Sequence, residues 1–228
     1  MKKSTIALLI AIAGLFLCFT VVNFKLKAEY TAGHIQSPMK TNILPPFHHI
    51  KEINQSPGKE NVYQRNILVL QQKDSSALVH DYYNPVGVNY FVQNDTLFIS
   101  PDSTFTGSDY NIIIYCKNLQ SLDASRSFIR LFNYVADSIS LTTSANAGIS
   151  CEHIKTNYIK MNIKEESSIF VTAADTLKKA DIYIQNNGLL NADNVYFKEK
   201  NLTIKNNGSI RASGQSLKNF GVITNNRN

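Results

Sequence analysis

Two adjacent histidines, His48 and His49, are the residues of this chain whose chemistry would best suit a metal ion. A metal site needs several ligands that converge on one point, whereas successive residues of a strand point to opposite faces. We therefore expect one solvent-facing and one half-buried histidine rather than a shared site. The sequence predicts no catalytic, cofactor-binding or metal-binding residue and no cofactor.

Two cysteines outside the N-terminal segment, Cys116 and Cys151, would suit redox chemistry. In an oxidising compartment they could form a disulfide. Their separation is not a multiple of the repeat found in the second half of the chain, which argues against stacking and favours two buried free thiols. The carboxylate pair Glu165-Glu166 falls at a predicted corner, where we find no nearby partner for acid–base catalysis.

Exposed aromatic side chains could bind sugars or anchor a partner, and Tyr82-Tyr83 and Tyr90-Phe91 form such a group. Because the chain has 11 Tyr, 12 Phe and no Trp, core packing is the simpler interpretation.

Four triplets consist of Asp, then Ser or Thr, then a third residue, and they resemble a pattern that is O-glycosylated in some envelope proteins. Such triplets also occur by chance wherever Asp starts a turn before a strand. The four triplets are Asp95-Thr96-Leu97, Asp102-Ser103-Thr104, Asp137-Ser138-Ile139 and Asp175-Thr176-Leu177.

The elements that must position these residues read almost wholly as β-strands. Ile67 to Leu70 is a short apolar run, and Val88 to Val92 faces Thr96 to Ser100 across a polar turn of hairpin type. The continuous apolar run from Asn111 to Cys116 predicts a strand buried on both faces. We expect no amphipathic helix after Val22.

A repeat occupies the second half of the chain. DIYIQNNGLLNAD (181–193) matches NLTIKNNGSIRAS (201–213), so that Gly188 aligns with Gly208. Weaker copies lie upstream, and the leading apolar positions of the copies are 122, 141, 163, 184 and 204. The differences between successive positions are 19, 22, 21 and 20.

A period of about 20 residues built from short strands and turns predicts stacked units that share one core, as in a parallel β-helix. Asn and Gly at the repeated Asn-Asn-Gly corner tolerate the left-handed backbone of a tight turn, and stacked Asn side chains can hydrogen-bond between coils. A leucine-rich repeat has a similar period, but its consensus is missing. An antiparallel sandwich is the main alternative.

The N-terminal residues carry a different signal. Residues 6–22 form an uncharged apolar run of 17 residues, at the short end of what crosses a bilayer. Its length and the residues that follow it favour an uncleaved signal anchor over a cleaved signal peptide, and the surroundings of Cys18 do not fit a lipoprotein. We predict a signal anchor and transmembrane helix at 1–28, a linker at 29–46 and a β-helix-like domain at 47–228.

Most of the formal net positive charge comes from the flanks of this segment. Its flanks hold Lys2, Lys3, Lys25 and Lys27, without which the formal net charge of +6 falls to +2. Because phosphate binding needs basic residues clustered on a folded face, we exclude nucleic acid as a partner. Two lysines lie on each side of the apolar segment, so the charge distribution does not decide its orientation in the membrane. We choose the N-terminus inside and the folded domain in the periplasm.

Three stretches, FHHIKEI, NDTLFIS and YNIIIYCKNLQSLDAS, precede Ser-, Asn- and Gly-rich rungs over about residues 47–213. In this order they resemble the bacterial family called putative auto-transporter adhesin head, GIN type. The resemblance implies an all-β fold, a right-handed parallel β-helix-like solenoid, in the envelope of Gram-negative bacteria. It brings no established activity and no transferable binding residues.

Two functions follow as expectations. The first is a non-catalytic, membrane-anchored envelope protein, held by residues 6–22, that serves adhesion, scaffolding or interaction with an envelope protein or glycan. The alternative is a polysaccharide-active β-helix enzyme, which would need carboxylates or basic residues converging on one strand face. A cleaved segment with a periplasmic or secreted domain, and a reversed anchor with a cytoplasmic domain, also stay open. The sequence leaves the oligomeric state undetermined.

Overall fold

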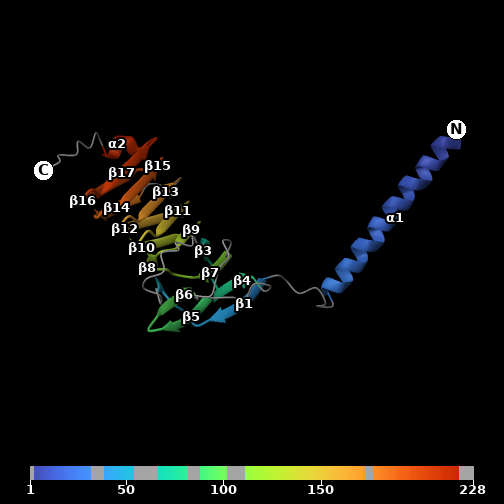
Figure 1. The fold of residues 1–228 in the computed structure, drawn as a ribbon, viewed down its shortest axis with the longest axis horizontal. Helices are drawn as coiled ribbons and strands as arrows, with labels where there is room; N and C mark the ends of the chain where they lie inside the picture. Colours follow the sequence, from blue (N-terminus) through green and yellow to red (C-terminus); the bar gives the residue numbers. More distant parts are fainter. Residues whose placement is uncertain are drawn as a thin grey trace. The chain divides into compact units, whose positions relative to one another are not determined.

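The computed structural model describes residues 3–31, 39–53, 66–81, 88–101, 111–172 and 177–220. The chain divides into two units, Met1–Pro38 and Met39–Asn228. The first contains helix α1, Lys3–Thr31, drawn in blue in Figure 1. The N-terminal helix expected from the apolar run is therefore present, and it extends beyond residue 28.

Among the described residues, no helix combines the length and the apolar character that crossing a membrane requires. The structure thus gives no support to the predicted membrane span over residues 6–22.

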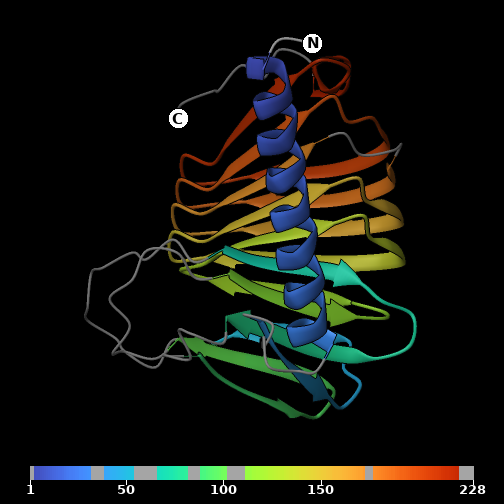
Figure 2. The same ribbon diagram turned by 90° about the vertical axis from the view of Figure 1, so that its right-hand side faces the viewer.

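The second unit is a β-solenoid in which each coil of about 20 residues contributes one strand to each of two facing sheets (Figures 1 and 2). In the described part of the chain, one sheet has nine strands in the order β1 (Met39–Leu44), β4 (Ser76–Asp81), β7 (Asn111–Cys116), β3 (Asn66–Gln71), β9 (Phe128–Phe132), β11 (Gly148–Glu152), β13 (Ser168–Thr172), β15 (Leu189–Asp193) and β17 (Ser209–Ser213).

The other sheet has eight strands over the same described ranges. Their order is β16 (Phe197–Ile204), β14 (Leu177–Ile184), β12 (Lys155–Ile163), β10 (Val135–Ser144), β8 (Ser121–Ser125), β2 (His49–Glu52), β6 (Thr96–Pro101) and β5 (Val88–Gln93). From β8 to β17 every pairing between neighbouring coils is parallel, which confirms the solenoid and overturns the antiparallel sandwich.

Buried side chains form columns that run through the coils. Strand register places Leu122 beside Leu141, and Leu141 beside Met161. A second column contains Thr143 beside Ile163. The predicted alignment of Leu141 with Ile163 is therefore wrong by two positions, because it compared apolar residues only and the column contains a buried threonine.

That threonine is matched to the corner of the next coil. The Ser167 hydroxyl donates a hydrogen bond to Thr143 Oγ1 over 2.8 Å, and both residues are buried. One coil later the position of Ser167 is taken by Gly188, and that of Thr143 by Ile163. A Cβ on Gly188 would lie 2.8 Å from the Ile163 carbonyl oxygen and 3.0 Å from its Cγ2. The corner above Thr143 thus holds a serine, and the corner above Ile163 holds a glycine, where an added Cβ would overlap both the backbone and the side chain of Ile163.

The corners themselves have the predicted left-handed backbone. Asn186 and Asn187 have φ of 51° and 62°, and Asn206 and Asn207 have φ of 49° and 62°. The Asn206 side-chain amide donates to Asn186 Oδ1 over 2.9 Å, so the predicted hydrogen bond between stacked asparagines is present.

The first strands of the unit depart from the repeat. β1 pairs antiparallel with β4, and β5 with β6, the latter as predicted for the hairpin. β1 lies within the range 29–46, which the sequence predicted as a linker. This segment has no apolar period, but its backbone hydrogen bonds are made by pairing with β4. β7 is buried on one face only, since Ile113 and Tyr115 on its other face are half-buried.

The last described element is the short helix α2, Ser216–Phe220, which packs beside β17. The Ser216 hydroxyl accepts from the Val195 amide at 2.8 Å, and the Phe220 ring meets Phe197 edge-on with centroids 5.5 Å apart. α2 was not expected from the sequence, because five residues are too few to show a helical period.

Replacement of Gly188 by Ser tests this matching of corner and column. We expect Gly188→Ser to lower the free energy of unfolding by about 1–3 kcal/mol, because the added atoms overlap Ile163. Ile163→Thr recreates the Thr143–Ser167 arrangement, so the double variant should be more stable than the two separate losses predict, by about 1 kcal/mol. Urea unfolding of all four proteins measures the coupling, and strictly additive losses would contradict it.

Candidate functional site

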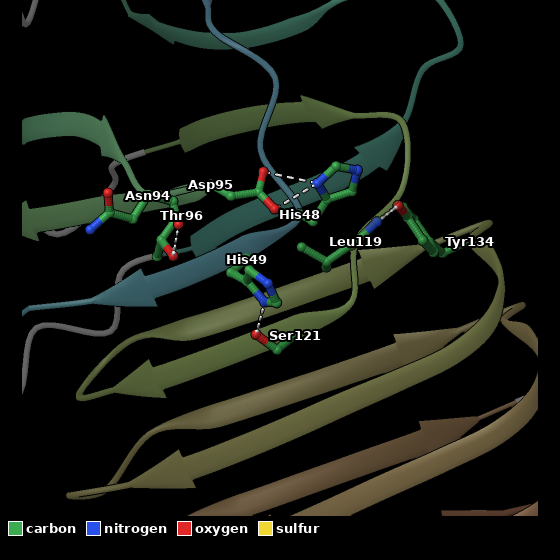
Figure 3. Close-up of polar contacts among 8 residues, drawn as sticks. All are labelled: His48, His49, Asn94, Asp95, Thr96, Leu119, Ser121 and Tyr134. Atoms are coloured by element: carbon green, nitrogen blue, oxygen red, sulfur yellow. Dashed lines mark hydrogen bonds and ion pairs between the residues drawn. The ribbon is translucent and has the colours of Figure 1, made fainter.

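The two histidines singled out in the sequence do not form one site (Figure 3). His48 Nδ1 lies 2.8 Å from each carboxylate oxygen of Asp95. His49 Nδ1 lies 2.7 Å from Ser121 Oγ. The two side chains have separate surroundings, with His48 bonded to the β5–β6 turn and His49 to the neighbouring strand β8, and both are half-buried rather than one being solvent-facing.

The backbone around these histidines shows their structural role. The amides of His48 and His49 both donate to the Asp95 carbonyl oxygen, at 3.0 and 3.2 Å, and the His48 carbonyl accepts from Gln120 at 2.7 Å. The hairpin turn, the start of β2 and the start of β8 are thereby stacked as successive coils. In the described ranges there is no group of three or more His, Cys, Asp or Glu side chains placed to hold a metal ion.

Cys116 and Cys151 are free and fully buried, so the favoured interpretation is confirmed and the disulfide is not formed. Burial raises the pKa of the Cys116 thiol to about 11 and that of Cys151 to about 12. Both groups are therefore protonated thiols at neutral pH, and a thiol is a poor nucleophile and a poor metal ligand.

The remaining candidates are dispersed. Glu165-Glu166 forms an exposed corner with φ of 51° and 58°. Phe91 stacks on Phe98 with ring centroids 4.9 Å apart, on strands of the eight-stranded sheet. Tyr82-Tyr83 lies outside the described residues.

The Asp-Ser/Thr triplets fall in different settings. Asp95-Thr96-Leu97 spans the hairpin turn and the start of β6, and Asp137-Ser138-Ile139 lies within β10 with its first two residues exposed. The triplet at 102–104 and the first two residues of the triplet at 175–177 lie outside the described residues, and nothing tests the glycosylation hypothesis.

A hollow of about 160 Å³ on the outer face of the nine-stranded sheet is the site that the sequence did not indicate. Three successive coils build it, from the β8–β9 corner, the β10–β11 corner and strand β13. Its lining consists of Arg126, Ser127, Phe128, Asn146, Ala147, Gly148, Ser168 and Phe170.

Gly148 allows the aromatic wall of this hollow. A Cβ at Gly148 would lie 2.6 Å from Cδ2 of the Phe128 ring, so any side chain there would displace the ring. Without one, Phe128 lies over the Gly148 backbone and meets Phe170 of β13, two coils away, with centroids 6.1 Å apart and planes tilted by 56°. Both rings are half-buried, so each keeps part of its surface for a ligand.

A buried carboxylate holds the corner beside the hollow. β2 pairs with β8 only as far as Lys51 and Asp123, which leaves the next part of β8 without a strand below it. Glu52 fills this place at 6% exposure: its Oε2 accepts from the Ser125 amide at 2.7 Å and its Oε1 from the Ser127 hydroxyl at 2.5 Å. Arg126, between these two serines, has φ of 72°.

The polar wall consists of Arg126 and Asn146, each at a left-handed corner position. In the described part of the chain neither side chain has a hydrogen-bond or ion-pair partner, and Arg126 is half-buried. The described lining contains no carboxylate, whereas glycoside hydrolysis ordinarily needs two. The lining residues of this hollow therefore supply no carboxylate for acid–base chemistry.

A second hollow of about 650 Å³ lies on the outer face of β1, β4 and β7. The side chains that line it are uncharged, among them Ile43, which is 82% exposed, and Tyr115. No charged group there would select one ligand class.

Thiol alkylation tests the burial of the cysteines. In the folded chain at neutral pH we expect iodoacetamide to label Cys116 and Cys151 at least about a hundredfold more slowly than in the denatured chain, because burial and the raised pKa values leave little accessible thiolate. Mass spectrometry of timed samples measures labelling at each position. Cys18→Ser should leave only slow labelling, and denaturant should expose all remaining thiols. Fast labelling of Cys151 before unfolding would refute its burial.

Residues 86–218 match the sequence model of a protein family described as "Putative auto-transporter adhesin, head GIN domain". No curated protein is significantly similar to the chain. Among solved structures it is similar to a putative adhesin of Parabacteroides distasonis, with 15% identity, 77% of this chain and 96% of that chain covered, and a TM-score of 0.43.

Two further structures of putative adhesins are also similar to the chain. A putative adhesin of Bacteroides fragilis has 12% identity, with 77% and 95% of the chains covered and a TM-score of 0.43. One of Parabacteroides merdae has 12% identity, the same coverage and a TM-score of 0.33.

Proposed function

Because the chain belongs to the family of the putative auto-transporter adhesin head GIN domain, we propose that it is a non-catalytic interaction module of the bacterial cell envelope. The observation that carries the proposal is the hollow beside Phe128 and Phe170. It combines partly exposed aromatic rings with Arg126 and Asn146, whose side chains have no partner among the described residues, on a rigid sheet face. Aromatic and arginine side chains dominate the free energy of many interfaces.

The solenoid supports this role by holding the contact residues still. Each of the strands β9, β11 and β13 is hydrogen-bonded along its length to the strand of the next coil. Residues a full coil apart in the sequence thus keep fixed spacings on one surface. A ligand that binds such a surface orders few protein groups, so little free energy is lost to conformational entropy.

Phe170→Ala tests the proposal directly. We expect the full-length variant, purified in mild detergent, to bind about tenfold more weakly than wild type to plates coated with bacterial cell envelopes or with mucin, because it loses half of the aromatic wall. Phe91→Ala is the matched control, since Phe91 is also a stacked, partly exposed aromatic but lies on the other sheet. Equal binding by both variants and wild type, or no binding by wild type, would contradict the proposal.

We further propose that the folded unit from Met39 lies outside the cytoplasm, exported and held at the membrane by residues 6–22. The support is the uncharged run of 17 residues with lysines on both sides, together with the adhesin description of the family. This part of the proposal concerns location and is independent of the hollow.

A reporter fusion tests the location. Alkaline phosphatase, which folds only in an oxidising compartment, should be active when fused after Asn228, and a green fluorescent protein at the same place should stay dark. The opposite pair of results would show a cytoplasmic domain. The mass of the mature chain provides the second readout: retention of residues 6–22 in the membrane fraction supports the anchor, and a chain that begins after them shows a cleaved signal peptide.

A further inference from the structure

We infer that the hollow beside Phe128 and Phe170 binds one carboxylate-bearing sugar ring, such as a uronic acid residue of a surface polysaccharide. The inference rests on the proposed interaction function and adds to it the chemical class of the ligand. Its basis is the division of the lining into an aromatic wall, formed by these two rings, and a cationic polar wall, formed by Arg126 and Asn146.

The size of the hollow limits the ligand. Its volume is about 160 Å³. An engineered protein cavity of about 150 Å³ admits one benzene molecule, so this hollow accommodates one six-membered ring with small substituents outside its mouth. A folded protein segment or a lipid chain would exceed that volume, whereas a single residue of a polysaccharide does not.

The aromatic wall suits the C–H face of a sugar. The faces of Phe128 and Phe170 carry partial negative charge, and the C–H bonds of a pyranose are polarised positively by the neighbouring oxygens. The planes of the two phenyl rings are tilted by 56°, so one sugar ring can contact both of them. Gly148 is needed for this wall, because a side chain there would overlap Phe128.

The polar wall selects a carboxylate. Arg126 is the one charged residue of the described lining, and the Glu52 carboxylate behind the corner is buried and hydrogen-bonded to Ser125 and Ser127. Guanidinium groups bind carboxylates through two parallel hydrogen bonds, and a half-buried guanidinium gains more from such a pair than an exposed lysine does. The Asn146 amide can donate to and accept from sugar hydroxyls. A neutral sugar would offer Arg126 no charged partner.

The strand arrangement disfavours an extended peptide. Peptides commonly bind to sheets by adding a strand at a free edge. β11, at the centre of the hollow, has β9 on one side and β13 on the other, so its backbone donors and acceptors are already paired. A ligand must therefore be recognised by side chains alone, as sugars on a flat β-surface are.

The probe that tests the inference is a galacturonic acid trisaccharide, with the neutral galactose trisaccharide as its comparison. Isothermal titration of the full-length chain at physiological salt should show binding of the acidic probe and at least tenfold weaker binding of the neutral one. Arg126→Gln should lower the affinity for the acidic probe by about tenfold and leave the affinity for the neutral probe unchanged, because it removes the charge-assisted pair.

Arg130→Gln is the matched control. Arg130 lies on β9 of the same sheet, removal of its charge changes the net charge equally, and its guanidinium is already paired with Glu152 at 2.9 Å. It should leave the affinity unchanged. Equal weakening by both substitutions would show non-specific attraction and overturn the inference, as would no binding of the acidic probe by wild type.

Asn146→Gly keeps the inference testable if Arg126→Gln unfolds the corner. Glycine tolerates the left-handed backbone of residue 146, where φ is 65°, and removes only the amide. It should weaken both trisaccharides several-fold, and unchanged affinities for both would count against the site. If Phe170→Ala abolishes envelope or mucin binding while the acidic trisaccharide does not bind wild type, the interaction function stands and the ligand class is wrong.

Discussion

The rest of the folded unit depends on parallel stacking in register, which places each buried side chain directly above its counterpart in the coil below. Coils joined by strand hydrogen bonds are separated by about 4.8 Å, so no side chain can avoid its neighbour by a shift along the axis. The pairs Thr143 with Ser167 and Ile163 with Gly188 show the result. Above Ile163 the corner residue is a glycine, and above the smaller Thr143 it is a serine whose hydroxyl pairs with the threonine.

At the first coil and at some corners, where no neighbouring strand is available, side chains must bond the buried backbone donors. Where β2 stops short of β8, the buried Glu52 carboxylate takes the place of a strand backbone and accepts from Ser125 and Ser127. Where the chain turns from β7 into β8, the buried Tyr134 hydroxyl accepts from the Leu119 amide (Figure 3). These are polar groups that the core requires, because a buried backbone donor without a partner is costly. Their burial does not make them catalytic.

The outer face of each sheet is free of this constraint, and binding chemistry can develop there without loss of the fold. The hollow beside Phe128 and Phe170 is such a case. It depends on Gly148 on the outer face and on the corner that the buried Glu52 supports. Arg126 belongs both to this corner and to the lining of the hollow. Recognition is a property of surface residues that the fold does not dictate.

Periodicity and turn chemistry are local properties, so the sequence by itself determined the features that depend on them alone. These are the coil length of about 20 residues, the left-handed Asn-Asn-Gly corners, the β5–β6 hairpin and the N-terminal helix. The tertiary structure alone decided that Thr143 belongs to an apolar column, that β1 is a strand rather than linker, and that Arg126, Asn146 and Phe170 meet. The three residues of the hollow come from three coils, and nothing in their local sequence marks them as partners. Their proximity arises only when the strand hydrogen bonds fix the register between coils.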